Sequence, residues 1–367
     1  MTIYGESHAA PDWPQAILHL DMDAFYVNVH LLDSPDDAGL PLVIGGQPQA
    51  RGVVASASYE ARQKGIRSAM PTSTAVRLCP QLKIVPANWP RIRECSRQVM
   101  DVLAAYGPLE QISVDEAYLD LSAAPDPLSL ATAAQRAVRQ ETGLPASVGL
   151  ATSKLVAKVA SDHEKPAGCT IVLPGAEAAF LAPLPTRVIW GIGPRTAAKL
   201  AELGVTTCGQ LAEADEARLT AVVGRQAASL RQRARGVDER PVVTERGEAK
   251  SVSQEWTFDR DVAEAAQLAA RLRQQATEVA QMLRRRGLVA HTIRVKFRWA
   301  DFTTFTRQQS LATPVDDEET IYRVGLALWR EHWPPGQPMR LIGLGATGLT
   351  PAGEGRQLSL PFGLGDG

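Results

Sequence analysis

The sequence predicts a multidomain chain in which an α/β unit is followed by a helical segment and a separate α+β domain. Candidate strands and helices alternate up to about residue 180, which is typical of helices packed on one sheet. From 184 to about 240 the signals are helical, and from 248 to 350 strands and helices follow one another again. At 367 residues the chain is long enough for two to four domains.

The first unit is expected to begin with a strand that runs into a helix, over 17–29. Residues 1–15 are polar and are expected to form a loose arm. Ser58 is a suitable cap for a short helix that Gly65 ends. The other expected elements are strands at 41–46 and 51–58, a helix over 91–106, paired strands within 109–122, a helix over 130–142 and a strand over 146–151.

The last third predicts a small domain with helices on one face of an antiparallel sheet. Its expected elements are a strand near 250–258, a helix over 262–286, strands at 291–299 and 303–311, a helix over 317–332 and a strand at 339–349. The remaining tail is rich in Gly and Pro.

Composition argues for an ordinary globular protein, with 45% apolar and 22% charged residues. No apolar run approaches 18 residues and no leader is recognisable, so we expect neither a membrane span nor a signal peptide, and a cytoplasmic location. The four cysteines are scattered without a CxxC pair, which argues against a zinc site or a disulfide framework.

Charge is distributed unevenly, although the formal net charge is only −1. Between Arg271 and Arg307 nine Lys and Arg residues stand against Glu278 and Asp301, which leaves that segment at +7. A basic block of this kind is typical of a surface that binds phosphates. A solvated, arginine-rich helix face would give the same pattern, so the two interpretations stay open at this point.

Two acidic motifs predict a metal site. Asp21 follows an apolar strand, and Asp115 and Glu116 are adjacent in a second apolar context. Neighbours on a regular strand point to opposite faces, so Asp115 and Glu116 can serve one site only at a turn or a bulge. Three carboxylates suit two Mg²⁺ ions about 3.5–4 Å apart, which would activate a hydroxyl and stabilise a leaving pyrophosphate. The alternative is that Asp21 and Asp23 cap a helix and the other pair forms a polar turn.

Five motifs occur in order: LDMDAFYVNVH, VVASASYEAR, GIRSAMP, ISVDEAYLDL and SVGLATSKLVAKVASDHEKPAG. In order and spacing they resemble the Y-family translesion DNA polymerases, in particular the bacterial DNA polymerase IV branch, over about 17–362. The resemblance implies a right-hand polymerase with a palm, small fingers, a helical thumb and an α+β little-finger domain. The implied boundaries are palm 1–26 and 93–183, fingers 27–92, thumb 184–246, little finger 247–350 and tail 351–367.

The resemblance further implies a monomeric, low-fidelity enzyme that adds dNTPs to the 3′-hydroxyl of a primer on template DNA and copies past damaged bases. It makes Asp21, Asp115 and Glu116 the catalytic metal ligands of two Mg²⁺ ions, joined by the Met22 carbonyl. Asp23 is then expected to be structural. Residues 27–30 read Val-Asn-Val-His where the family commonly has Ala-Ser-Val-Glu, a departure that concerns helix packing.

The same resemblance gives the nucleotide site. Tyr26 stands at the steric-gate position, where its ring would clash with a ribose 2′-hydroxyl, while Phe25 is expected in the core. The triphosphate is expected to contact a second group of residues: Ser56, Tyr59, Arg62 and Lys165. The residues expected to roof the nascent base pair are small, which predicts a roomy pocket with weak discrimination: Ala55, Ala57 and Ala69.

DNA contacts are expected at two places. The stretch WGIGPRTAAKLAELGV resembles a helix-hairpin-helix, in which Gly191 and Gly193 turn the backbone tightly and present amides to a phosphate. The basic segment supplies the second set of candidates: Arg284, Arg285, Arg286, Arg294, Lys296 and Arg298.

The tail sequence QLSLPF looks like the peptide by which bacterial polymerases engage the β sliding clamp. Its contacting residues would be Gln357, Leu358, Leu360, Pro361 and Phe362. The alternative is that this peptide docks back on its own domain.

Two rival functions are weaker. A catalytically silent, clamp-bound adaptor of a mutagenesis complex would be expected to lack the acids, and here all three are present. A non-polymerase repair module built on the helix-hairpin-helix would leave the acidic motifs and YEAR without a role.

Overall fold

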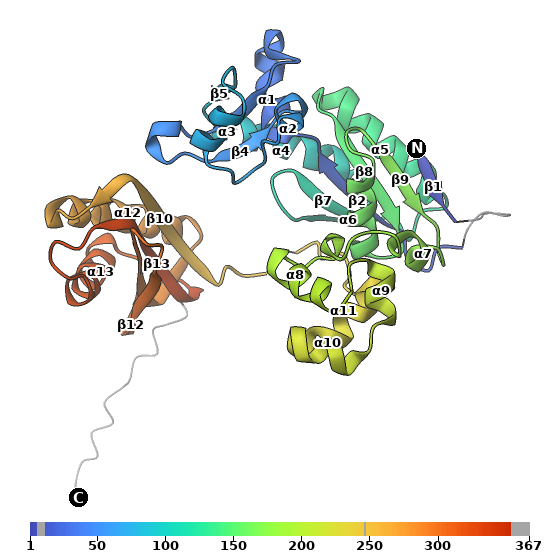
Figure 1. Cartoon of the computed structure of the whole chain (residues 1–367). Helices are drawn as coiled ribbons and strands as arrows, with labels where there is room; N and C mark the ends of the chain where they lie inside the picture. The colour runs from blue at the N-terminus through green and yellow to red at the C-terminus, as the bar shows by residue number, and fades with distance from the viewer. Residues whose placement is uncertain (6–11, 246, 354–367) are drawn as a thin grey trace, which may run out of the picture. The chain divides into compact units, whose positions relative to one another are not determined.

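The computed structural model describes residues 1–5, 12–245 and 247–353. The chain separates into two compact units, and each is described by itself (Figure 1). The first comprises Met1–Gly46, Val54–Met70 and Thr74–Arg246, and the second Gln47–Val53, Pro71–Ser73 and Gly247–Gly367.

The first unit is built on a six-stranded mixed sheet. Its strand order is β1 (Thr2–Tyr4), β9 (Cys169–Val172), β8 (Ala146–Ala151), β2 (Ile17–Met22), β7 (Glu116–Asp120) and β6 (Leu109–Gln111). The central strand β2 runs antiparallel to both of its neighbours, so its end is enclosed between β7 and β8.

Strand β1 corrects the expectation of a loose arm for residues 2–4. It pairs in parallel with β9, where Thr2 lies opposite Thr170 and Tyr4 opposite Val172. The Tyr4 ring packs edge-on against Phe180, with 4.8 Å between the ring centroids. The pairing adds an apolar and hydrogen-bonded anchor that the local polarity of the segment did not reveal.

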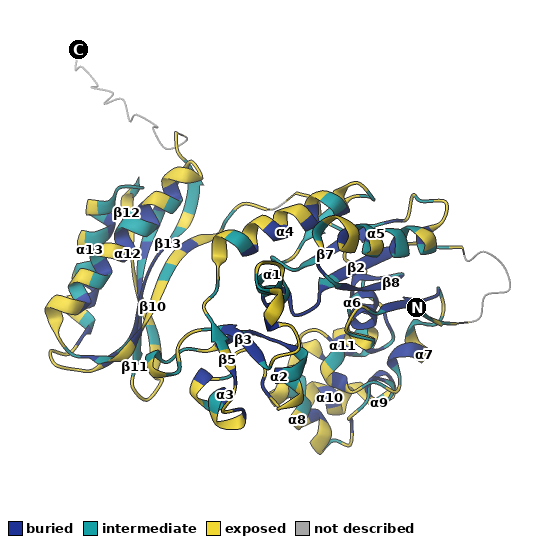
Figure 2. Ribbon diagram, turned by 90° about the horizontal axis from the view of Figure 1, so that it is seen from above, coloured by how far each residue is buried: buried dark blue, intermediate teal, exposed yellow. Residues whose placement is uncertain are grey.

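Helices cover both faces of this sheet, whose strands are mostly buried (Figure 2). On one face lie α4 (Trp89–Ala104) and α5 (Pro127–Thr142), and Leu18 and Leu20 of β2 point into this core. On the other face lies α6 (Lys154–His163), with Val156 and Ala160 in a second core. Alternate residues of β2 therefore face α6, among them His19.

Helix α6 lies unusually close to the sheet because of one glycine. A methyl group at Gly149 on β8 would lie 2.1 Å from the carbonyl oxygen of Ala157 and 2.4 Å from the amide nitrogen of Ser161. Only glycine allows this approach, which fixes the height of α6 above the strands.

A three-stranded sheet follows in the order β4 (Val54–Ala57), β3 (Leu42–Gly45) and β5 (Lys83–Val85). Helix α1 (Phe25–Asp33) connects the main sheet to it, and α2 (Tyr59–Gln63) and α3 (Thr72–Leu78) belong to the same region. Its small core includes Val43, Val54 and Ile66. Strand β5 and helix α3 were not predicted from the sequence.

The helical segment after β9 packs on the α6 face. It consists of α7 (Glu177–Leu181), α8 (Pro194–Glu202), α9 (Cys208–Glu213), α10 (Glu216–Val223) and α11 (Ala227–Ala234). Leu200, Leu211 and Leu230 share one core with Val156 of α6. Four 3-10 helices are present in the described chain: η1 (Pro35–Asp37), η2 (Pro48–Ala50), η3 (Thr186–Val188) and η4 (Gly224–Gln226).

The second unit contains a four-stranded antiparallel sheet, which confirms the predicted α+β domain. The strand order is β10 (Ser251–Val262), β13 (Met339–Pro351), β11 (Leu288–Trp299) and β12 (Thr304–Val315). Helices α12 (Ala265–Arg285) and α13 (Glu318–His332) pack their apolar faces on one side of it. Among the described helices of the whole chain, none is long and apolar enough to span a membrane.

Candidate active site

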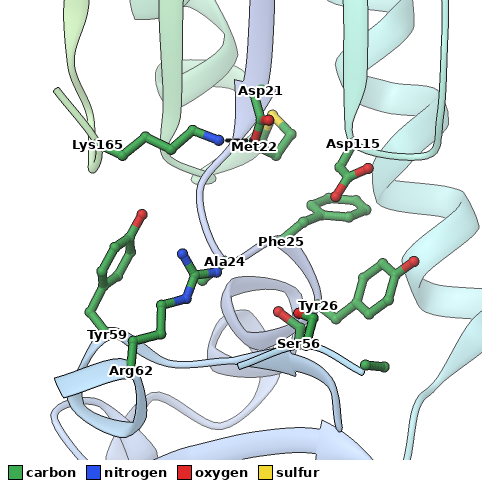
Figure 3. Close-up of a pocket in the computed structure, with 12 residues that line it drawn as sticks. Asp21, Met22, Ala24, Phe25, Tyr26, Ser56, Tyr59, Arg62, Asp115 and Lys165 are labelled. Carbon is green, nitrogen blue, oxygen red and sulfur yellow. Dashed lines mark ion pairs between the residues drawn. The ribbon is translucent and has the colours of Figure 1, made fainter. Parts of the chain in front are cut away.

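A pocket of about 150 Å³ opens where β2 ends, and its wall gathers most of the predicted nucleotide and metal residues (Figure 3). Ala24 makes the turn from β2 into α1 in the left-handed region, with φ 42°. The lining residues are Asp21, Met22, Ala24, Phe25, Tyr26, Ala55, Ser56, Tyr59, Arg62, Ser68, Asp115 and Lys165.

Asp115 and Glu116 lie at the hairpin between β6 and β7, as the sequence requires if both serve one site. The Ser113 hydroxyl accepts the amide N–H groups of Asp115 (3.2 Å) and Glu116 (3.1 Å) and so shapes the turn. Glu116 lies directly opposite Asp21 in the β2–β7 register, and the Asp115 carbonyl accepts the Met22 amide at 3.0 Å. The three acidic residues therefore meet at the ends of paired strands.

Each of the three carboxylates has a partner of its own. The Lys165 ammonium lies 2.7 Å from Asp21 (Figure 3). It lies at the same distance from Asp162. The Lys158 ammonium lies 2.5 Å from Glu116. The Asp115 carboxylate accepts the Ser113 hydroxyl at 2.5 Å. Two lysines thus compensate charges that would be costly to bury alone.

The pKa values of the two facing carboxylates, Asp21 and Glu116, are shifted in opposite directions. Burial raises the pKa of Asp21 to about 7, although Lys165 opposes the shift. Burial would also raise the pKa of Glu116, but the hydrogen bond and charge of Lys158 outweigh it and hold that pKa below its ordinary value. A proton taken up by this pair therefore resides on Asp21 rather than on Glu116.

The donor set has the chemistry of a hard-cation site. As the described residues stand, no three His, Cys, Asp or Glu side chains are gathered around one point that could hold a metal ion. Nevertheless Asp21, Asp115 and Glu116 supply only oxygen atoms and occupy neighbouring positions at the strand ends. Met22 lines the same pocket wall. The residues therefore fit a divalent cation, provided that Lys158 and Lys165 release their carboxylates.

Asp23 is structural, as expected. Its side chain is 1% exposed and does not line the pocket. It accepts hydrogen bonds from the Ser147 hydroxyl (2.9 Å), the Ala167 amide (2.7 Å) and the Tyr59 hydroxyl (3.2 Å). These partners satisfy the buried carboxylate and join the main sheet to α2.

The expected phosphate ligands line one side of the pocket. Ser58 caps α2 by accepting the Ala61 amide, as predicted. The Arg62 guanidinium lies 4.7 Å from the Tyr59 ring centre and donates its Nε to the Ala57 carbonyl at 3.0 Å. In Figure 3 the guanidinium and the Tyr59 hydroxyl point into the pocket, toward the side from which Lys165 extends.

The expected roof needs a correction. Ala57 is 1% exposed and belongs to the core of the small sheet, because its side of β4 faces that core. Ala69 is exposed, with φ 66°, and does not line the pocket. Ala55 does line it, together with Ser56 and Ser68.

A second, larger cavity of about 1080 Å³ lies on the α6 face between the sheet and the helical segment. Its lining includes Glu116 and Lys158 and, from the helical segment, Trp190, Gly191 and Gly193. Glu116 borders this cavity, whereas Asp21 and Asp115 border the small pocket. The carboxylates therefore occupy the wall between two cavities.

Only one of the two glycines in the helix-hairpin-helix is conformationally required. Gly191 has φ 99°, a left-handed conformation that favours glycine. Gly193 has an ordinary φ of −79° at the N-cap of α8, and a Cβ there would meet no atom within 4 Å. The expected tight turn is thus correct for Gly191 and wrong for Gly193.

The six basic candidates of the second unit do not form one surface. Arg294, Lys296 and Arg298 alternate along β11 with buried apolar residues, so they face the side of the sheet away from the helices. Arg284, Arg285 and Arg286 lie at the C-terminal end of α12, which packs on the opposite side. On the open face Lys296 pairs with Glu255 at 2.8 Å and Arg298 donates to the Thr304 hydroxyl at 2.8 Å.

The sequence-based reasoning missed three residues that hold the acids in place: Ser113, Ser147 and Lys158. Lys158 had a usable signal, because Lys154, Lys158 and Asp162 recur every fourth residue on one face of α6. The predicted clamp-binding residues Gln357, Leu358, Leu360, Pro361 and Phe362 lie outside the described residues.

Comparison with protein families matches three parts of the chain. Residues 20–162 match the impB/mucB/samB family, residues 174–205 the IMS family HHH motif, and residues 249–360 the impB/mucB/samB family C-terminal domain. The first match contains all three acids, and the second contains Gly191 and Gly193.

Curated relatives and a solved structure agree with these matches. A DNA polymerase IV from Halorhodospira halophila is 41% identical over 91% of this chain and 95% of its own. A DNA polymerase IV from Methanoculleus marisnigri is 42% identical over 89% of this chain and 92% of its own. A solved Y-family DNA polymerase chimera superimposes with a TM-score of 0.82 at 25% identity, covering 91% of this chain and 98% of that one. The chain therefore belongs to the Y family of DNA polymerases, in the DNA polymerase IV branch.

Proposed function

We propose that the protein is a DNA-directed DNA polymerase that adds dNTPs to the 3′-hydroxyl of a primer by two-metal catalysis and copies past damaged bases. The observation that carries this proposal is the place of the carboxylates in the wall between two cavities. The small pocket has phosphate-binding side chains, and the large cavity leads to the helix-hairpin-helix. A nucleotide and a primer end could thus meet at the same three acids.

In the small pocket, Arg62, Tyr59, Ser56 and Lys165 would hold the triphosphate. Arg62 offers the forked geometry that suits phosphate oxygens, and Lys165 offers a point charge. Both Tyr59 and Lys165 donate to carboxylates, Asp23 and Asp21 respectively, so each would exchange a carboxylate partner for a phosphate oxygen. Tyr26 would lie below the sugar and exclude a ribose 2′-hydroxyl.

Two divalent ions, Mg²⁺ in this proposal, would activate the primer hydroxyl and neutralise the leaving pyrophosphate. Asp21, Asp115 and Glu116 would hold them with the Met22 carbonyl. Asp21 must lose its proton for this role, because a protonated carboxyl is a poor metal ligand. Lys165, once released from Asp21, would still be close enough to the pocket to face an anionic substrate.

Low fidelity and lesion bypass are supported by the small side chains that line the pocket, namely Ala55, Ser56 and Ser68. A wall of small residues makes few contacts that a misshapen base pair would lose, so the pocket discriminates weakly. The lesions that the family resemblance suggests are minor-groove adducts of guanine.

Duplex DNA would be held by phosphate contacts at Gly191 and Gly193 and along the open face of β11, at Arg294, Lys296 and Arg298. The tail peptide Gln357–Phe362 would engage a β sliding clamp. We further propose that the enzyme acts as a monomer in the cytoplasm.

The test is extension of a primer on an undamaged template with Mg²⁺ and four dNTPs. We expect the wild type to extend the primer, and Asp115→Ala and Glu116→Ala to lose at least about 100-fold in rate, because each removes a group that stabilises charge in the transition state. Asp101→Ala, an exposed acid on α4, is the matched control and should extend normally.

Circular dichroism would show whether each variant is folded. Equal extension by the wild type and Glu116→Ala would refute the two-metal assignment. Duplex binding without extension by any folded protein would instead favour the adaptor function. Repeating the assay on a template with a minor-groove guanine adduct tests lesion bypass separately.

A further inference from the structure

The ring of Tyr26 is held between two other aromatic side chains. Phe25 lies on one side, with 5.8 Å between ring centroids, and Trp89 lies on another at 5.5 Å and an interplanar angle of 74°. The second geometry is edge-to-face, an arrangement in which the positive edge of one ring meets the negative face of another.

Trp89 is 46% exposed, and the start of a capped helix fixes its backbone. It is the first residue of α4, followed by Pro90, and the Asn88 side chain caps this helix by accepting the Arg91 amide at 3.3 Å. Single exposed aromatics are common on protein surfaces and by themselves mean little. Trp89 differs because its ring contacts Tyr26, the pocket residue that excludes a ribose in the proposed function.

A small cavity of about 50 Å³ also borders Tyr26. Its lining is mixed, because Val29, Ile44 and Ile92 are apolar whereas Asp33 and Arg91 form an ion pair. A cavity that binds benzene measures about 150 Å³, so this space lets the Tyr26 ring shift from the position shown in Figure 3 but does not hold the whole ring.

We infer that Trp89 is a positioning residue for sugar selection, which keeps the Tyr26 ring in the place where it excludes a ribose. The inference rests on the proposed function, in which Tyr26 is the residue that meets the 2′-hydroxyl. Trp89 touches neither the pocket nor a nucleotide in it. Its effect passes through the ring contact, and an aromatic pair of this kind contributes about 0.5–1.5 kcal/mol, or roughly 2- to 13-fold.

The experiment measures kcat/KM for dCTP and for rCTP opposite a template G. Trp89→Ala should raise kcat/KM for rCTP about 3- to 10-fold and change the value for dCTP less than about twofold, because the lost contact affects only the exclusion of the 2′-hydroxyl. Trp89→Phe keeps an aromatic edge and should retain most of the selectivity. Arg93→Ala, an exposed change on the same helix, is the matched control.

Tyr26→Ala separates this inference from the proposed function. If Tyr26→Ala accepts rCTP and Trp89→Ala keeps wild-type selectivity, the role of Trp89 is refuted and the steric gate stands. If Tyr26→Ala itself remains selective, the gate assignment fails. Equal losses with dCTP and rCTP in Trp89→Ala would show a merely structural role and overturn the inference. Should Trp89→Ala not fold, Trp89→Leu, which keeps apolar bulk without a ring edge, gives the same comparison.

Discussion

Asp23 joins three segments of the first unit through one buried carboxylate. Its donors are Ser147 on β8, Ala167 in the loop before β9, and Tyr59 on α2. Because both oxygens of this side chain accept hydrogen bonds, its burial is tolerated. Its neighbour Asp21 has a similar place on the chain but a lysine partner and a raised pKa.

We predict that Asp23→Ala lowers the free energy of unfolding by about 3 kcal/mol or more, because it leaves buried donors without an acceptor. Urea denaturation followed by circular dichroism measures this. Asp36→Ala removes an exposed carboxylate and should change the stability by less than about 0.5 kcal/mol. Equal stabilities for the two variants would contradict the structural role of Asp23.

The four cysteines are buried free thiols. Burial raises the pKa of Cys208 to about 11 from an ordinary 9.0. The unfolded chain therefore loses this proton first as the pH rises, so the contribution of Cys208 to stability is complete below pH 9 and declines between pH 9 and 11.

We predict that no thiol of the native protein reacts rapidly with DTNB at pH 8, and that four react in denaturant, since the reagent needs an accessible thiolate. Cys208→Ala should also flatten the decline in stability between pH 9 and 11. Rapid reaction of one native thiol at pH 8 would contradict the burial of that cysteine in the folded protein.

At the scale of single residues, the acids could be predicted from their types and spacing, because each motif is local in the sequence. Their partners could not. Lys158 meets Glu116 only because α6 lies across β2, β8 and β9 at a fixed height, and this depends on register and packing. The role expected for Ala57 was wrong for the same reason, since the orientation of β4 decides which side faces the core.

At the scale of elements, strand β11 presents two different faces. Ile293, Val295 and Phe297 pack under α12 and α13, while the residues between them carry the positive charge. On the neighbouring strand β13, Gly343 and Gly345 have no side chain on the charged face, where a Cβ would come within 3.3 Å of Lys296 or 3.1 Å of Arg294. Both glycines are buried, so side chains of the neighbouring strands cover the backbone of β13 at these two positions.

We predict that replacing Arg294, Lys296 and Arg298 together by Ala weakens duplex binding more than replacing Arg284, Arg285 and Arg286. The slope of log K against log salt concentration is negative, and each lost phosphate contact should make it less steep by about 0.9. Fluorescence anisotropy at several salt concentrations gives both the affinity and the slope. A larger loss from the α12 triplet would place the DNA on the helix side instead.

Elements with strong local periodicity were predictable, and elements that depend on distant partners were not. Helix α12 and strands β11 to β13 were found within a few residues of their bounds, because apolar spacing marks them. Strand β1 was missed, since its three residues become a strand only through pairing with β9, more than 160 positions later. Strand β5 is equally short and pairs in parallel with β3.

At the scale of the whole molecule, the chain divides into a larger unit with the candidate active site and a smaller unit with the basic sheet. The fold class could be predicted from the alternation of elements and from the motif order. The boundaries of palm, fingers, thumb and little finger stay predictions, as does the clamp peptide.

We predict that deleting residues 354–367 leaves primer extension on free DNA unchanged and abolishes its stimulation by a β sliding clamp. The removed segment contains QLSLPF, and the described residues that line the two cavities all remain. The comparison uses clamp-loaded and clamp-free templates, with Leu358→Ala plus Phe362→Ala in the full chain as a second variant. Stimulation that survives both changes would rule out the tail as the clamp contact.

Gly149 carries no functional group, yet the position of Lys158 above the sheet depends on it. Gly149→Ala would push α6 away from β8, and we expect a loss of several kcal/mol or an insoluble protein. In a mutational scan scored by growth or activity, position 149 would be indistinguishable from the acids. Only a parallel measurement of protein abundance or melting temperature would separate a loss of folding at Gly149 from a loss of catalysis at the acids. Gly247→Ala is the tolerant reference, because a Cβ at Gly247 would meet no atom within 4 Å.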